Sequence, residues 1–201
     1  MLAALIVSSV MIESIPIFLE GELVAIGPLR QRLASTYEAW ERDLDLASRA
    51  MRAPHAGVEG HGEPRLFREA ARPGTHAFTV YETIYDSKAP RPIGFAMLAN
   101  VDERHRTATY TIVLGERDTW GTGLGSAATK LVLDYAFDAL GLASVELRVR
   151  TTDEQAIRAF ERAGFSKVGV RRRALFAGAS PEDLLVMDAV AEGRKAPAQN
   201  T

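Results

Sequence analysis

The hydrophobic positions change their spacing several times along the chain, and the stretches rich in β-branched and aromatic residues predict strands. Three of these stretches, 76–83, 93–101 and 107–114, are separated by turn-forming segments, which favours an antiparallel meander. Shorter stretches of the same kind lie before and after them. The expected strands are 21–29, 76–83, 93–101, 107–114, 144–149, 168–175 and 184–189.

Between the strands, apolar residues recur at helical spacing. The segment 33–51 predicts one or two amphipathic helices, and a short helix is expected near 66–71. A longer helix is expected over 123–140, followed by Gly141. The last helix begins after Thr152 or Asp153 as N-cap and ends at Gly164.

This order of elements predicts a mixed α/β fold, with a central, mostly antiparallel twisted sheet flanked by helices. We expect a single domain over residues 21–190, preceded by an N-terminal extension, 1–20. The polar tail, 191–201, is expected to be disordered.

Composition narrows the possible functions. The chain has 201 residues, of which 24 are basic and 26 acidic, so its net charge of −2 gives no general case for binding nucleic acid or a membrane surface. It has no cysteine, which excludes disulfides, thiolate metal sites and a cysteine nucleophile. The first eleven residues are apolar, but no Lys or Arg precedes Arg30, so a cytoplasmic protein is expected.

The segment 115–126, GERDTWGTGLGS, is a glycine-rich loop that leads from a predicted strand into a predicted helix. Glycine lets the backbone approach a ligand closely, and the first-turn N–H groups and the helix dipole favour an anion. The segment therefore predicts a site for a phosphorylated ligand. The alternative is a tight turn that binds nothing.

Two known phosphate motifs fit less well. A P-loop needs Gly-Lys-Ser/Thr, whereas Gly125 is followed by Ser126 and Ala127. A dinucleotide fingerprint would use Glu146 as its acidic residue, but the glycine spacing is G-x-G-x-G and Glu146 lies in the middle of a predicted strand.

The run from Trp120 to Phe165 contains W-G-x-G-x-G, the strand V-E-L-R-V and the helix A-I-R-A-F-E-R-A-G-F. This run resembles the acetyl-CoA-binding core of the GNAT (Gcn5-related N-acetyltransferase) superfamily, in its ribosomal-protein-alanine acetyltransferase-like branch. The resemblance implies a GNAT-type domain, acetyl-CoA as cosubstrate, an amine acceptor and a possible homodimer.

The resemblance also implies which residues hold the cosubstrate. The loop would bind the pyrophosphate, and the strand that ends at Leu114 would pair with pantetheine. The implied set is Ile112, Val113, Leu114, Trp120, Gly121, Thr122, Gly123, Leu124, Gly125, Ser126, Asp153 and Phe160. Two positions depart from the family: Asp153 replaces its usual Asn, and Phe160 replaces the Tyr that serves as the acid for the leaving thiolate.

Transfer to an amine needs a base, because an alkyl amine with a pKa near 10 is mostly protonated at pH 7. The candidate carboxylates are Glu82, Glu116 and Glu146, with Glu116 preferred because it directly follows the cofactor strand. Tyr110 is a candidate replacement for the missing proton donor. No metal site is expected, although His55 and His61 lie in one glycine-rich loop.

The predicted function is therefore an acetyl-CoA-dependent N-acetyltransferase. The acceptor is a primary amine: a protein N-terminus, a polyamine or an amine-bearing small molecule such as an antibiotic. Without cysteine, direct transfer in a ternary complex is the expected route. The alternative is a CoA-binding sensor or interaction module that has lost catalysis.

Overall fold

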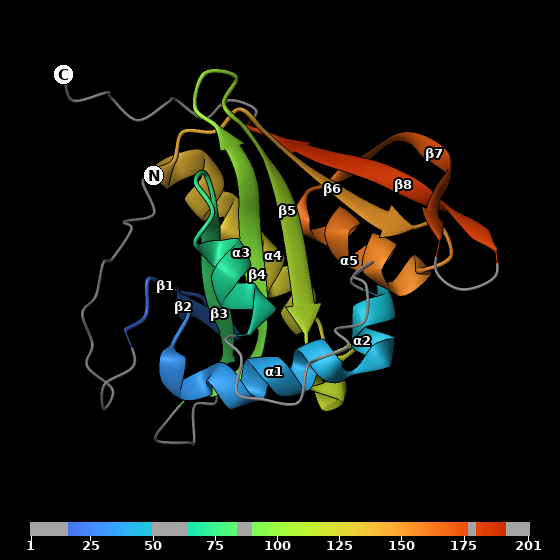
Figure 1. Cartoon of the computed structure of the whole chain (residues 1–201). Coiled ribbons are helices and arrows are strands. Elements are labelled where there is room, and N and C mark those ends of the chain that lie inside the picture. The colour runs from blue at the N-terminus through green and yellow to red at the C-terminus, as the bar shows by residue number, and fades with distance from the viewer. Residues whose placement is uncertain (1–15, 50–63, 84–89, 177–179, 192–201) are drawn as a thin grey trace.

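The computed structural model describes residues 16–49, 64–83, 90–176 and 180–191. Within these ranges, eight strands form one sheet in the order β1-β2-β3-β4-β5-β6-β8-β7 (Figure 1). The strands are β1 (Leu19–Glu20), β2 (Val24–Pro28), β3 (His76–Glu82), β4 (Arg91–Asp102), β5 (Thr107–Leu114), β6 (Ser144–Arg150), β7 (Ser166–Phe176) and β8 (Pro181–Val190). Neighbouring strands are antiparallel except β5 and β6, which are parallel. The predicted antiparallel meander is confirmed.

Helices cover both faces of the sheet. They are α1 (Ala34–Arg42), α2 (Leu44–Arg49), α3 (Arg65–Ala70), α4 (Leu124–Asp134) and α5 (Glu154–Ala163). In Figure 1, α3 lies in front of the sheet and α4 behind it. The predicted fold class, a mostly antiparallel sheet flanked by helices, is confirmed. No helix within the described ranges is long and apolar enough to cross a membrane.

Each face of the sheet has its own hydrophobic core. Side chains of α4 and α5 pack with Tyr110 and Val145 on one face. Tyr37, Trp40 and Leu46 of α1 and α2 pack on the other, against strand residues that include Val113. Alternate residues of β5 therefore belong to different cores, as expected for a strand that is covered on both sides.

The two helices that follow β5 and β6 begin and end as their sequences predict. Gly123 precedes α4 with φ +94°, and Asp153 caps α5 by accepting a hydrogen bond from the Ala156 N–H at 3.1 Å. The helix α4 continues as a π-helical turn, Tyr135–Ala139, before Gly141. Gly164 ends α5 with φ +112°.

Several expectations concern residues that the structure describes only in part. The first fifteen residues of the predicted extension, the loop with His55 and His61, and residues 192–201 of the predicted tail lie outside the described ranges. Inside the extension, Leu19 and Glu20 form β1, which pairs with β2. The sheet thus begins two residues before the predicted domain boundary at residue 21.

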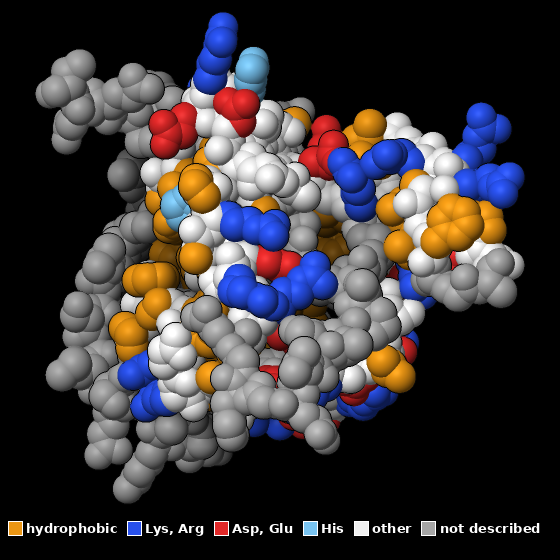
Figure 2. Space-filling view, viewed as in Figure 1, with side chains coloured by type: hydrophobic (Ala, Val, Ile, Leu, Met, Phe, Trp, Pro, Cys, Tyr) orange, Lys and Arg blue, Asp and Glu red, His pale blue; other side chains and the backbone are white. Residues whose placement is uncertain are grey.

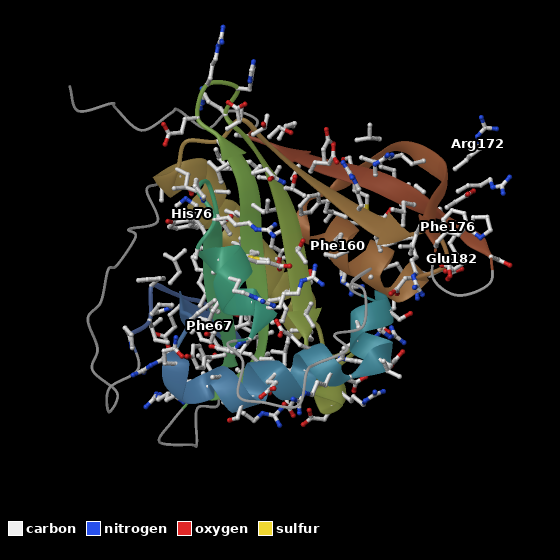
Figure 3. All side chains as sticks on the ribbon, viewed as in Figure 1. Phe67, His76, Phe160, Arg172, Phe176 and Glu182 are labelled. Atoms are coloured by element: carbon white, nitrogen blue, oxygen red, sulfur yellow. The ribbon has the colours of Figure 1, made fainter. Side chains whose placement is uncertain are left out.

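The strand β7 forms one edge of the sheet and is exposed along most of its length. Its exposed apolar side chains include Val168, Val170 and Phe176, and apolar side chains gather at this end of the molecule (Figure 2). In Figure 3, Arg172 and Phe176 lie at the far end of the β7–β8 hairpin, away from Phe160 of α5.

The strands β5 and β6 pair over only a short distance. Their parallel register runs from Thr107 opposite Ser144 to Thr109 opposite Glu146. Beyond that point β5 continues to Leu114 and β6 to Arg150 without pairing with each other. A gap therefore opens within the sheet, between two strands that both continue.

Gly94 allows a close contact between β4 and the end of β5 that borders this gap. Gly94 of β4 pairs with Leu114, and a Cβ at Gly94 would meet the backbone carbonyl of Val113. We expect Gly94→Ala to lower the free energy of unfolding by about 1–3 kcal/mol, because the paired backbone cannot yield. Urea denaturation measures this loss.

Gly169→Ala is the matched control, since Gly169 is also a strand glycine but has open space around its Cβ position. Its effect should stay within about 0.5 kcal/mol. Equal losses in the two variants would contradict the proposed contact.

Candidate active site

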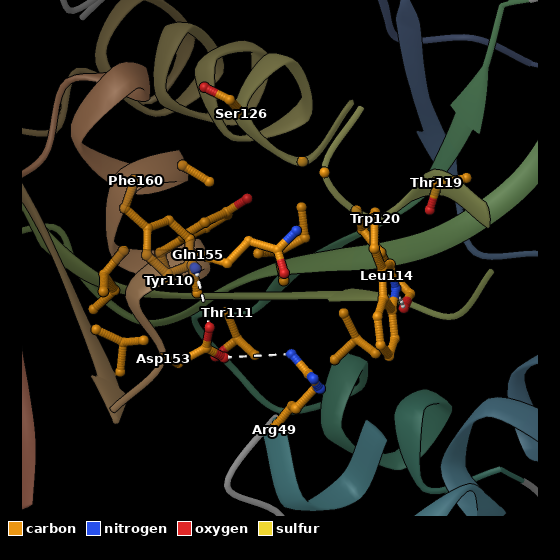
Figure 4. Close-up of a pocket in the computed structure, with 18 of the residues that line it drawn as sticks. Arg49, Tyr110, Thr111, Leu114, Thr119, Trp120, Ser126, Asp153, Gln155 and Phe160 are labelled. Atoms are coloured by element: carbon orange, nitrogen blue, oxygen red, sulfur yellow. Dashed lines mark hydrogen bonds and ion pairs between the residues drawn. The ribbon is translucent and has the colours of Figure 1, made fainter. Parts of the chain in front are cut away.

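A cleft of about 200 Å³ occupies the gap between β5 and β6 (Figure 4). Its walls come from β5, β6, the loop before α4, one side of α5 and, from the opposite face, α2. The predicted site residues that line it are Tyr110, Ile112, Val113, Leu114, Trp120, Gly121, Gly123, Gly125, Ser126, Asp153 and Phe160. The sequence thus predicted most of the lining that comes from the glycine-rich loop and from β5.

The backbone of β5 offers hydrogen-bond donors to the cleft. The Gly115 N–H donates to the Ile93 carbonyl of β4 at 2.8 Å. Because backbone groups alternate in direction along a strand, the N–H groups of Leu114 and Ile112 point away from β4 and towards the gap. An extended ligand with carbonyl groups can accept from these donors.

The glycine-rich loop brings further N–H groups to one end of the cleft. Gly121 and Gly123 adopt φ +79° and +94°, which side chains with a Cβ rarely adopt. Gly125 approaches β5 so closely that a Cβ there would lie 3.2 Å from Cδ1 of Leu114. The free N–H groups at the N-terminus of α4 therefore lie at the open end of the cleft and suit an anion.

Trp120 connects this loop to β5. Its indole N–H donates to the Leu114 carbonyl at 3.1 Å. Two guanidinium groups lie over the ring: Cζ of Arg49 at 4.6 Å and Cζ of Arg117 at 5.3 Å from its centroid. Trp120 thus forms part of the cleft wall and is held from the side of α2.

Tyr110 lines the cleft, but its hydroxyl is engaged elsewhere. The hydroxyl donates to Oγ1 of Thr129 at 3.0 Å, and Thr129 donates to the Gly125 carbonyl at 2.7 Å. Burial raises the pKa of the Tyr110 phenol well above its ordinary value, so the hydroxyl stays protonated. The chain Tyr110–Thr129–Gly125 ties β5 to the first turn of α4.

Phe160 forms the apolar wall of the cleft opposite the loop. Its ring packs edge-on against Tyr110 and Phe165, with centroid distances of 6.5 and 6.0 Å. A phenyl ring donates no proton. The geometry therefore gives Phe160 a packing role.

Five predicted site residues are not part of the cleft lining: Thr122, Leu124, Glu82, Glu116 and Glu146. The Thr122 hydroxyl donates to the Thr119 carbonyl at 2.7 Å, and Leu124 is buried in the core behind the loop. These two residues therefore stabilise the loop and the helix start.

Each of the candidate carboxylates has a partner outside the cleft lining or beside it on its own strand. Glu116 accepts a hydrogen bond from the Trp40 indole at 3.0 Å. Glu146 pairs with Nε of Arg148 at 3.1 Å, and Glu82 pairs with Arg91 at 3.0 Å. Within the described ranges, no group of three or more His, Asp or Glu side chains is arranged to hold a metal ion.

Sequence reasoning missed the contribution of α2. Leu46 and Arg49 line the cleft, and Arg49 pairs with Oδ2 of Asp153 at 3.8 Å (Figure 4). Arg148 of β6 and Arg162 of α5 also line it. The helical spacing of 33–51 predicts that Leu46 is on the apolar side of a helix. No local pattern in the sequence predicts that this helix packs against the loops that follow β5 and β6.

Known proteins resemble the chain in sequence and in fold. It is 34% identical to spermidine N(1)-acetyltransferase of Escherichia coli K12 over 76 residues, which cover 38% of this chain and 40% of that protein. The aligned part thus spans less than half of this curated relative.

Two solved structures of acetyltransferases from Vibrio cholerae share the fold. The spermidine N-acetyltransferase in complex with CoA and spermine matches with a TM-score of 0.74 and 18% identity, covering 85% of this chain and 96% of that one. The spermidine/spermine N-acetyltransferase with manganese ions matches with a TM-score of 0.64 and 19% identity, covering 84% and 92%.

The sequence profile of the acetyltransferase (GNAT) domain matches residues 27–166, which is more than half of the chain. This match covers the strands β3 to β6, the glycine-rich loop and α5. The chain therefore belongs to the acetyltransferase (GNAT) domain family.

Proposed function

We propose that the protein is an acetyl-CoA-dependent N-acetyltransferase that acts on a primary amine. The observation that carries the proposal is the cleft between the parted strands β5 and β6, which opens beside a glycine-rich loop at a helix N-terminus. The Vibrio cholerae spermidine N-acetyltransferase, which shares the fold, was solved in complex with CoA and spermine.

The residues of the cleft fit acetyl-CoA. The N–H groups of 121–126 suit the pyrophosphate, because Gly121 and Gly123 leave the approach open where side chains would crowd it. The inward N–H groups of Ile112 and Leu114 suit the amide carbonyls of the pantetheine arm. Apolar walls at Val113, Leu147 and Phe160 exclude water from the arm.

Bound acetyl-CoA would supply an activated acetyl group: the amine nitrogen would form a bond to the thioester carbon, the carbon–sulfur bond would break to release the CoA thiolate, and the proton lost by the amine would pass to a base. The chain contributes position and charge. N–H donors of β5 aimed into the gap can stabilise the negative charge that develops on the carbonyl oxygen. With no cysteine in the chain, the acetyl group passes directly to the amine.

Neither Glu146 nor Glu116 lines the cleft, and of the two we choose Glu146 as the base for its position along the gap. Phosphates held at the loop would fix one end of the pantetheine arm at the open end of the gap, so the thioester at its other end would extend towards the closed end. Glu146 lies at that closed end, opposite Thr109 in the last paired position, whereas Glu116 lies near the loop end. Only its place directly after β5 in the sequence favours Glu116.

For the acceptor, the relatives favour a polyamine. The acidic residues of α1, of α2 and of the link between them add little support for a polycation, because they already have partners in the structure. Glu38 pairs with Arg42, Asp43 and Asp45 pair with Arg117, and Glu41 accepts the backbone N–H groups of Arg65 and Leu66. A protein N-terminus, as in the ribosomal-protein-alanine acetyltransferase-like branch, and an amine-bearing antibiotic stay as alternatives.

A CoA-binding module without catalysis is the second candidate. Phe160 supports it, since no hydroxyl is present there, and the Tyr110 hydroxyl is engaged with Thr129. A leaving thiol with a pKa near 8.5 can depart without an acid, however, so the missing hydroxyl does not abolish transfer.

The loop assignment can be tested at Gly123. Gly123→Ala should weaken CoA binding about tenfold or more, the equivalent of one lost charge-assisted hydrogen bond, as measured by titration calorimetry. Gly164→Ala is the control: Gly164 has a positive φ and open space like Gly123, but it caps the C-terminal end of a different helix, α5. It should lose similar stability and keep its CoA affinity. Unchanged affinity in Gly123→Ala would show that the loop does not bind CoA.

A variant at Tyr110 shows whether its hydroxyl ties β5 to α4 or donates a proton in the reaction. Tyr110→Phe should lower the free energy of unfolding by about 1 kcal/mol, because the hydrogen bond to Thr129 is lost, and should keep kcat within about threefold. Thermal melting and thiol-release assays measure the two effects. A loss of kcat of about 100-fold or more would instead identify the phenol as a proton donor.

Turnover itself can be tested with a panel of amines: spermidine, an alanine-initiated peptide and an aminoglycoside. Thiol release should follow sequential kinetics. Glu146→Gln should lower kcat at neutral pH by about 100-fold, whereas Glu116→Gln, which still accepts from Trp40, should change it by less than about threefold. Ping-pong kinetics would contradict direct transfer, and CoA binding without turnover across the panel would favour the second candidate.

A further inference from the structure

Arg49, the last residue of α2, reaches two different parts of the cleft. Its guanidinium lies 4.6 Å from the centroid of the Trp120 ring, and its Nη1 lies 3.8 Å from Oδ2 of Asp153 (Figure 4). A third contact, from Nε to Oδ1 of Asp45 at 3.5 Å, is within α2. The side chain is 44% exposed, so these contacts lie at the mouth of the cleft.

The two residues that Arg49 contacts belong to opposite walls. Trp120 follows β5 and is fixed to it by the hydrogen bond to the Leu114 carbonyl. Asp153 follows β6 and caps α5 through the Ala156 N–H. Since β5 and β6 do not pair beyond Thr109 and Glu146, no ladder hydrogen bond sets the distance between these walls. Arg49 joins them from outside the sheet.

The charge of Asp153 gives this link a second consequence. Asp153 lines a cleft whose loop suits phosphate groups, and a carboxylate there repels an anionic ligand. The ion pair with Arg49 offsets that charge. Loss of the guanidinium would leave the carboxylate facing the ligand without its partner.

We infer that Arg49 is a positioning residue for the cosubstrate, which acts through Trp120 and Asp153 and rests on the proposed function. Its guanidinium holds the two walls at the separation that the pantetheine arm needs, and it neutralises a carboxylate that lines the cleft. Helix α2 thereby becomes part of the CoA site.

A double-mutant cycle tests this inference. Titration calorimetry with CoA compares the wild type, Arg49→Gln, Asp153→Asn and the double variant. Asparagine preserves the N-cap of α5, because its side-chain oxygen also accepts from a backbone N–H. Arg49→Gln should weaken CoA binding about fivefold, the upper end for an exposed ion pair. The double variant should bind CoA more tightly than Arg49→Gln does, since it removes the unpaired carboxylate.

Arg42→Gln is the matched control. Arg42 ends the neighbouring helix α1, and its side chain is 58% exposed and pairs with Glu38 four residues earlier. This variant should keep the affinity of the wild type. A role of Arg49 in helix stability alone would not be rescued by a change at Asp153, which lies on a different element.

Tryptophan fluorescence gives an independent signature. Trp120 is one of two tryptophans in the chain, and Arg49 lies over its ring. Arg49→Gln should shift the tryptophan emission of the free protein, and loss of that shift in Trp120→Phe assigns the signal to Trp120. In titration calorimetry, Arg49→Lys should bind CoA more tightly than Arg49→Gln does.

The outcomes separate this inference from the proposed function. If the wild type binds no CoA, the proposed function and the role of Arg49 are both overturned. If the wild type binds CoA and Arg49→Gln binds it equally well, or if the double variant binds no better than Arg49→Gln, only the role of Arg49 is overturned.

Discussion

The parting of β5 from β6 is the constraint on which the site depends. Adjacent strands normally satisfy each other's backbone groups, and an unpaired buried N–H or carbonyl costs free energy. Here the Leu114 carbonyl is satisfied by the Trp120 indole, and the N–H groups of Ile112 and Leu114 face the gap. A ligand with carbonyl groups along an extended arm completes the interrupted ladder, so the binding site is an unfinished part of the sheet.

The gap stays open because each of its strands is held on its other side. From Gly94 to Ala99, β4 pairs with β5, and β6 pairs with β8 over its full length, from Ser144 to Arg150. The two cores then fix the strands from both faces. On the face of α1 and α2, the Arg150 guanidinium donates to the Ser48 hydroxyl at 2.9 Å and brings α2 against β6. The separation of the walls thus depends on contacts that lie outside the gap.

Local patterns in the sequence predicted those parts of the molecule that depend on neighbouring residues. The alternation of 107–114, the glycines of the loop and the cap at Asp153 each determine an element without reference to the rest of the chain. The gap was not predictable in this way, because it depends on where a parallel pairing stops. The place of Arg49 was not predictable either, since it lies more than 70 residues from Trp120 and about 100 from Asp153 in the sequence. The hydrogen bond from the Tyr110 hydroxyl to Thr129 was not predictable for the same reason, because it joins β5 to α4.

The presence of phenylalanine at position 160 changes what the rest of the cleft must contribute. Where no hydroxyl protonates the leaving sulfur, the rate depends more on positioning and on the donors that stabilise negative charge, which together supply most of the rate in transfer reactions. Both effects require walls that do not move. Tyr110, Phe160 and Phe165 pack together on one side of the cleft, and Trp120 is held under Arg49 on the other. The hydroxyl that Tyr110 directs to Thr129 contributes to the stability of this arrangement, because it ties β5 to the first turn of α4.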